Sequence, residues 1–177
     1  MDGWQRDYTE EKEVVGYKMF NGDFTNRYGM KYELGQTYYK EGNIRFGLGG
    51  NGFHFCRNFE DTFKYYDTSE DFILAEVVGS GKLVEYNDEY YEFFQMYASS
   101  ELKIVRIIDR KEIMDMAKKI SYIGYRFKRF IQLYYLTEEE EKELIELYPK
   151  YEDYILHQRE RKMKLLEENE KKMTLHM

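Results

Sequence analysis

The chain has 177 residues, a net charge of −7 and 18% aromatic side chains, a share that excludes a mostly disordered chain because large rings can build a core. The single cysteine excludes an internal disulfide, no basic segment followed by an apolar run opens the chain, and charges interrupt every apolar stretch before the roughly 20 residues of a membrane span. We therefore expect a cytoplasmic protein without a membrane segment.

The uneven distributions of charged side chains and of glycines along the chain predict its domains. Residues 1–108 hold 19 acidic and 12 basic side chains and residues 109–177 hold 15 of each, while all but one of the 13 glycines precede residue 82. We expect an α+β protein with an arm at residues 1–13, a small, mainly antiparallel sheet domain at 14–108 and a helical subdomain at 109–177. The acidic sheet domain argues against affinity for phosphate backbones and suits docking on a basic partner.

Short β-branched or aromatic runs between Gly, Asn and Asp predict the strands. They are residues 14–20, 37–39, 44–46, 53–56, 72–78, 82–86 and 102–108. Ser80 and Gly81, after Gly79, predict a tight turn that joins two of these strands into a hairpin.

Two short helices are expected within the sheet domain. Asn58 is a suitable N-cap for the first, which places Phe59, Phe63 and Tyr66 on one face. The second is expected to begin at Asn87 and to include the aromatic residues Tyr90, Tyr91, Phe94 and Tyr97.

Helical signals dominate after residue 108. Asp109 is a good N-cap for apolar residues at helical spacing, and Gly124 is expected to break that helix from the next. Thr137 and Glu140 have the spacing of a capping box. Pro149 suits the first turn of a long last helix at about residues 150–171. The apolar stripe of that helix is narrow, and it consists of Tyr151, Tyr154, Ile155, Leu165 and Leu166. So narrow a stripe favours packing on its own protein over binding a partner helix.

His54 and Cys56 lie two residues apart in an expected strand, so their side chains share one face. A thiolate and an imidazole so placed form a nucleophilic pair when a third group orients the histidine. The alternative, which we favour, is that both are packing residues, since lone cysteines are among the most buried residue types. No metal site is expected, because His157 and His176 lie far away in sequence.

The segment from about residue 14 to residue 108 resembles a family of small uncharacterised phage and prophage proteins. Its motifs here are GYKMFN at residues 16–21, GFHFC at 52–56 and KIVR at 103–106, with Met19 where the family has a small residue. The resemblance implies a mobile-element origin and names no activity.

The same region is more faintly similar to the ADP-ribosyltransferase fold, with Tyr65 ending the helix after the GFHFC strand. That likeness implies NAD as cofactor and two catalytic residues. His54 takes the place of a tyrosine that stacks on nicotinamide, and Glu101 resembles a glutamate that stabilises an oxocarbenium-like transition state. Tyr17 and Lys18 lie where the family has an NAD-holding Arg or His, which makes them candidate binding residues, although lysine lacks the bidentate fork of arginine.

A basic and aromatic segment follows at residues 121–135, and its residues 122–130 are a candidate RNA contact. Its candidate binding residues are Tyr125, Arg126, Lys128 and Arg129. Interleaved cations and rings can pair phosphates and stack bases. We favour the alternative, in which Tyr122, Phe130 and Tyr134 face the core of a helix and the cations face solvent.

Together these patterns predict a non-enzymatic, mobile-element protein that needs no cofactor and acts in the host cytoplasm. Its expected partner is a host protein or ribonucleoprotein complex, such as a CRISPR-type immune nuclease that the chain inhibits. Carboxylates and tyrosines of the acidic domain would fill a basic channel, and the C-terminal helices would add apolar contact. The alternative is an ADP-ribosyltransferase that uses NAD to modify a host target.

Overall fold

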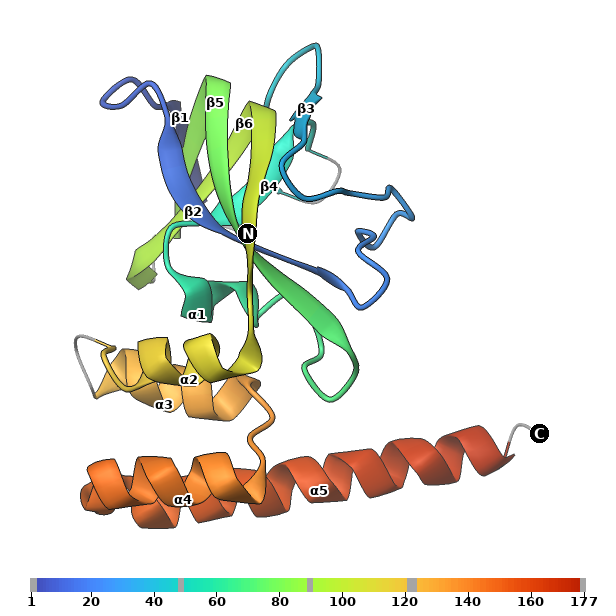
Figure 1. Cartoon of the computed structure of the whole chain (residues 1–177), viewed down its shortest axis with the longest axis vertical. Coiled ribbons are helices and arrows are strands. Elements are labelled where there is room, and N and C mark those ends of the chain that lie inside the picture. Colours follow the sequence, from blue (N-terminus) through green and yellow to red (C-terminus); the bar gives the residue numbers. More distant parts are fainter. Residues whose placement is uncertain (1–2, 48–49, 89–90, 121–123, 176–177) are drawn as a thin grey trace. The chain divides into compact units, whose positions relative to one another are not determined.

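The computed structural model describes residues 3–47, 50–88, 91–120 and 124–175. Two compact units make up the chain, Met1–Arg110 and Lys111–Met177, and the boundary expected after residue 108 lies two residues before this division. The first unit is built on an antiparallel sheet and the second is helical (Figure 1). The expected α+β class is therefore confirmed.

Six strands form the sheet of the first unit. They are β1 (Gly3–Asp7), β2 (Val14–Asn21), β3 (Thr37–Tyr39), β4 (Phe53–Cys56), β5 (Phe72–Asp88) and β6 (Tyr91–Ile108). The runs predicted for β2, β3 and β4 agree with these bounds to within one residue. β1 belongs to the segment expected to be an arm, and it pairs with the C-terminal part of β5.

Four of these strands close a circuit of pairings. β5 pairs with β2, β2 with β4, β4 with β6, and β6 again with β5. A sheet that returns on itself encloses one of its faces, and that face carries the core. The core residues are Tyr8, Val14, Phe20, Tyr32, Phe53, Phe55, Ala75, Val77, Leu83, Tyr97, Leu102 and Ile104.

The predicted hairpin turn at Ser80 and Gly81 is wrong, because β5 continues through it. Gly81 has a φ of 73°, and the register between β5 and β6 shifts between Ser80 and Leu83. Glycine tolerates this left-handed conformation, so the extra residue forms a bulge and the strand bends without ending.

The helix predicted from Asn87 is also wrong, since residues from Tyr91 onward form β6. Successive side chains of this strand are buried on both faces. Tyr97 packs in the enclosed core, whereas Met96 packs against Cys56 and Tyr86. Burial on both faces removes the alternation of polar and apolar residues that would have indicated a strand.

Two smaller predictions also needed correction. Residues 44–46 form no named strand, and only one isolated bridge joins Ile44 to Asn51. The short helix α1 (Phe59–Thr62) follows Asn58 as predicted, but the Asn58 side chain makes no capping hydrogen bond to it. Its amide instead donates to the Asp61 carboxylate at 3.2 Å.

The helices after the sheet are α2 (Arg110–Ala117), α3 (Tyr125–Leu133), α4 (Glu138–Leu147), the 3-10 helix η1 (Pro149–Tyr151) and α5 (Glu152–Leu175), and all of their residues except Arg110 belong to the second unit. The capping box is confirmed: Thr137 accepts from the Glu140 backbone amide, and the Glu140 carboxylate accepts from the Thr137 amide. Pro149 begins a 3-10 turn, after which α5 starts at Glu152.

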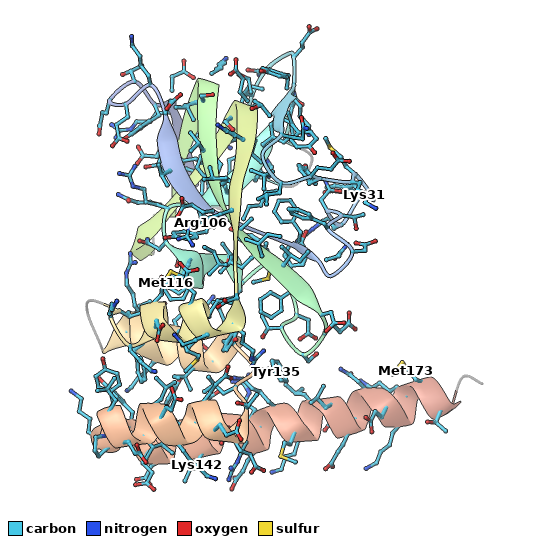
Figure 2. All side chains as sticks on the ribbon, viewed as in Figure 1. Lys31, Arg106, Met116, Tyr135, Lys142 and Met173 are labelled. Carbon is cyan, nitrogen blue, oxygen red and sulfur yellow. The ribbon has the colours of Figure 1, made fainter. Side chains whose placement is uncertain are left out.

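A lysine of α5 fastens this helix to α3. The Lys162 ammonium donates to the carbonyls of Ile131 and Tyr134 at the C-terminal end of α3. These carbonyls lack helical partners and form the negative end of the helix dipole, so a cation there is stabilising. Beyond Lys162 the described side chains of α5 are exposed, including Leu165, Leu166 and the labelled Met173 (Figure 2).

Glycine at position 16 is needed where β2 meets β4. A Cβ atom built there would overlap the carbonyl oxygen of Cys56, which is backbone and cannot swing away. We expect Gly16→Ala to lower the free energy of unfolding of the first unit by about 2 kcal/mol, because the strands must separate. Urea unfolding followed by the fluorescence of Trp4, the only tryptophan, which lies on β1, measures this change.

Gly124→Ala is the matched control, since nothing lies within 4 Å of its added Cβ. Equal stability of wild type and Gly16→Ala would contradict the close approach of the two strands.

Candidate functional site

His54 lies in the middle of β4, where its backbone pairs with Ala98 of β6. Its ring stands against Phe46, with 4.7 Å between the ring centres, and its Nε2 atom lies 3.1 Å from the Arg45 carbonyl oxygen. Burial lowers the pKa of His54 to about 4, although the Arg45 carbonyl opposes this shift. The imidazole is therefore neutral at pH 7 and is held by a backbone partner.

Cys56 ends β4 and is buried between Tyr86 and Met96. Burial raises the pKa of the Cys56 thiol, and the neighbouring Asp61 carboxylate adds to the shift. A thiol is nucleophilic as the thiolate, and this environment disfavours the thiolate. His54 and Cys56 thus have the properties of packing residues and not those of an activated pair.

Tyr17 and Lys18 lie on β2 beside this strand. Tyr17 pairs with Cys56, and its ring meets Phe59 edge-on at 6.3 Å between centres. The Lys18 ammonium donates a 2.6 Å hydrogen bond to the carbonyl oxygen of His54. Burial lowers the pKa of Lys18 to about 8; Cys56 opposes the shift, and the nearby cations Lys40 and Arg27 add to it. The structure thus brings Tyr17, Lys18 and His54 together.

Glu101 lies further along β6, opposite Tyr39 of β3 and Ser80 of β5. Its carboxylate accepts a 3.1 Å hydrogen bond from the Ser80 hydroxyl. Three steps along the strand, which span about 10 Å, separate it from Ala98, the backbone partner of His54. Tyr17 thus pairs with Cys56 and the Lys18 side chain reaches the His54 carbonyl, whereas Glu101 has other partners.

The candidate residues of the basic and aromatic segment belong to α3 in the second unit. Tyr125 is exposed, Phe127 and Phe130 are buried, and Phe130 stacks on Tyr134 at 4.9 Å between ring centres. Tyr122 lies outside the described residues.

Of the three cations in that segment, Lys128 has its ammonium 5.4 Å from the centre of the Tyr154 ring and 6.0 Å from that of Tyr151. Arg126 and Arg129 lie on the same helix, and both are partly exposed. Lys128 therefore contacts aromatic rings of its own unit.

Sequence reasoning gave no role to two cations, Arg27 and Lys40, whose charges contribute to the lowered pKa of Lys18. Arg27 follows β2 in a loop, donates to the Tyr65 carbonyl at 3.0 Å and stands 5.8 Å from the centre of the Tyr66 ring. Lys40 follows β3, donates to the Gly52 carbonyl at 3.4 Å and stands 5.1 Å from the centre of the Phe53 ring. Both act on the pKa of Lys18 and of His54.

No sequence signal predicts that Arg27 and Lys40 act on the pKa of Lys18, because the two residues come from different loops. Arg27 also lines a pocket of about 390 Å³ whose other lining residues are Asn21, Tyr65, Tyr66, Asp67, Glu70, Asp71 and Phe72.

Over the described ranges, no group of three or more His, Cys, Asp or Glu side chains is arranged to hold a metal ion. Within the same ranges, every helix is too short or too polar to cross a membrane.

A family model described as a domain of unknown function, DUF7666, matches residues 14–116, more than half of the chain. The match takes in β2 to β6, and therefore Lys18, Lys40, His54 and Glu101. Neither the curated proteins nor the solved structures gave a match.

The lowered pKa of Lys18 predicts a pH-dependent stability. Between pH 8 and the ordinary lysine value of 10.5, the unfolded chain holds more protons at this site than the folded chain does. The free energy of unfolding therefore gains a contribution that rises with pH, by at most about 1.4 kcal/mol per pH unit. This contribution is absent below pH 8, where the lysine is charged in both states.

Lys18→Met removes the titrating group and should remove this contribution. Urea unfolding of wild type and variant in phosphate-free buffers from pH 7 to 10 measures the difference between their free energies of unfolding. The titration of other groups cancels in this difference. A difference that stays constant with pH would show that the folded environment does not desolvate Lys18.

Proposed function

The chain belongs to the DUF7666 family, and we propose that it is a non-enzymatic protein of a mobile element that binds and inhibits a host macromolecular machine. The motifs at residues 16–21, 52–56 and 103–106 support the origin through their resemblance to phage proteins. The surface of the first unit supports binding. The proposed target is an immune nuclease or its ribonucleoprotein complex.

The observation that carries the binding role is the exposure of three large apolar side chains on β3 and on the segment that precedes it in the chain. Tyr28 is 79% exposed, Leu34 55% and Tyr39 70%. Tyrosine is enriched in protein interfaces because it combines a large apolar face with a hydroxyl group. We name Tyr28, Leu34 and Tyr39 the β3 surface.

The position of β3 in the sheet adds to this support. β3 is the terminal strand next to β6 in the strand order. A terminal strand can accept a strand from a partner by backbone hydrogen bonding, with side chains providing specificity. The acidic excess of residues 1–108, 19 against 12 basic side chains, favours a partner with a basic surface.

A double substitution, Tyr28→Ser with Tyr39→Ser, tests the role of the β3 surface. We expect it to weaken partner binding at least tenfold, since two exposed rings lose about 1–2 kcal/mol each on truncation at an interface. The measurement is the efficiency with which a phage plates on a host that carries the defence system and expresses the chain. Wild type should raise plating, and the double variant should not.

Ile107→Ser is the matched control, because Ile107 is 45% exposed on β6 of the same unit and lies outside the β3 surface. It should plate as wild type does. Equal plating by all three proteins, with all of them folded, would remove the β3 surface from the mechanism. Failure of wild type to raise plating on any defended host would contradict inhibition itself.

The substitution Glu101→Gln tests the alternative, an ADP-ribosyltransferase, because it removes a charge and hardly changes the volume of the side chain. We expect purified wild type, with labelled NAD and host extract, to form no labelled product, and we expect Glu101→Gln to inhibit as wild type does. The physical reason is that the Glu101 carboxylate is bonded to Ser80 and lies about 10 Å of strand away from the partner of His54. NAD consumption that Glu101→Gln abolishes would establish the transferase instead.

A further inference from the structure

One face of α5 is covered by its own unit only in the first half of the helix. Ile155, Gln158 and Lys162 follow one another at helical spacing and are buried, and α5 contacts α3 and α4. Every side chain from residue 163 to residue 174 is exposed, and this half of α5 extends past the other helices of its unit (Figure 1). The face therefore continues beyond the helices that cover it.

The exposed half of this face is apolar around one amide. Leu165, Leu166, Asn169 and Met173 continue the spacing of three and four residues, so they lie in line with the buried residues upstream. A helical segment of this length gains most of its stability from packing of its apolar face. A partner on this face would therefore stabilise the segment. We name these four residues the α5 stripe.

The order of residues in the α5 stripe indicates that the partner is a second copy of the chain. Leu165 precedes Asn169 by four residues, and Met173 follows it by four. In an antiparallel pair centred on Asn169, Leu165 would lie against the partner's Met173, and the two Asn169 amides would meet. A two-fold contact requires such a self-complementary surface. Each amide can donate to and accept from the other, whereas an apolar partner would leave both groups unsatisfied.

The charged residues beside the α5 stripe fit this arrangement on one flank. Glu168 and Lys172 lie on the same flank, and in an antiparallel pair the same flanks of the two helices meet. Glu168 would then lie beside the partner's Lys172, and Lys172 beside the partner's Glu168. Glu170 lies on the other flank, close to the partner's Glu170, and this pair of like charges weakens the contact.

The buried half of the face determines the direction of pairing. A parallel partner would lie along the whole face and reach Ile155, Gln158 and Lys162, which are already covered within their own unit. An antiparallel partner centred on Asn169 overlaps only the exposed half and places the remainder of each second unit at opposite ends of the pair. The antiparallel arrangement therefore avoids a clash with α3 and α4.

We propose that residues 163–175 of α5 pair with the same segment of a second copy in an antiparallel helical dimer centred on Asn169. The contact is about 20 Å of helix, which is short for a protein interface. We therefore expect a weak dimer with a dissociation constant on the order of 10–100 μM. The dimer involves neither the β3 surface nor the proposed inhibitory role.

Sedimentation equilibrium of the full chain from about 5 to about 500 μM tests for the dimer. We expect a reversible monomer–dimer equilibrium, and Leu165→Ser with Met173→Ser should raise its dissociation constant at least tenfold. Leu147→Ser is the matched control, because Leu147 is exposed on α4 of the same unit and should dimerise as wild type does. A wild type that stays monomeric throughout, or a double variant that dimerises as wild type does, overturns the proposal.

Two neutralised carboxylates test the register of the pair. Glu168→Gln should weaken the dimer about threefold because an attraction is lost, whereas Glu170→Gln should strengthen it about threefold because a repulsion is lost. Both variants change the net charge by the same amount, so a general repulsion between copies would shift both in one direction. Equal shifts would therefore overturn the antiparallel register.

Cross-linking tests the direction of pairing independently of affinity. Cys56, the only cysteine, is buried, so an introduced thiol is the one that reacts. Under mild oxidation, Leu165→Cys and Met173→Cys should form a disulfide-linked heterodimer when they are mixed, and neither should cross-link alone. Cross-linking by each variant alone, without preference for the mixture, would indicate a parallel pair and overturn the proposal.

Discussion

One backbone pairing, between Tyr17 of β2 and Cys56 of β4, closes the circuit of strands in the first unit. It requires Gly16, because any side chain there would meet the Cys56 carbonyl. A circuit closed by so short a contact leaves an opening at its next residue. Lys18 lies next to that contact, and its ammonium donates to the carbonyl oxygen of His54 on the other strand. The environment of Lys18 therefore depends on how the sheet closes.

The same closure decides what the GFHFC motif does. Phe53 and Phe55 enter the enclosed core, whereas His54 and Cys56 pack on the other face. Burial favours the neutral forms of both polar groups, so the motif contributes packing and a carbonyl acceptor for Lys18.

Local signals were sufficient where a feature is made by neighbours in sequence. The capping box of Thr137 and Glu140 needs only one helical turn, and β4 lies between turn residues. β5 and β6 were misjudged because a bulge at Gly81 and burial on both faces of β6 are set by residues far along the chain. Lys18 could be singled out from the sequence, but its hydrogen bond to the His54 carbonyl joins two strands far apart in the chain and has no sequence signal.

Two lysines, one in each unit, have a pKa lowered to about 8 by burial, and their surroundings differ in an informative way. Lys162 donates to two carbonyls at the end of α3, and the nearby Glu141 favours its charged form. Lys18 donates to one carbonyl, and the full charges that act on it are cations. Lys162 is thus accounted for by the helix end that it caps. Lys18 instead has one carbonyl acceptor, its ammonium lies 5.7 Å from the centre of the Phe20 ring, and burial between strands is the main cause of its lowered pKa.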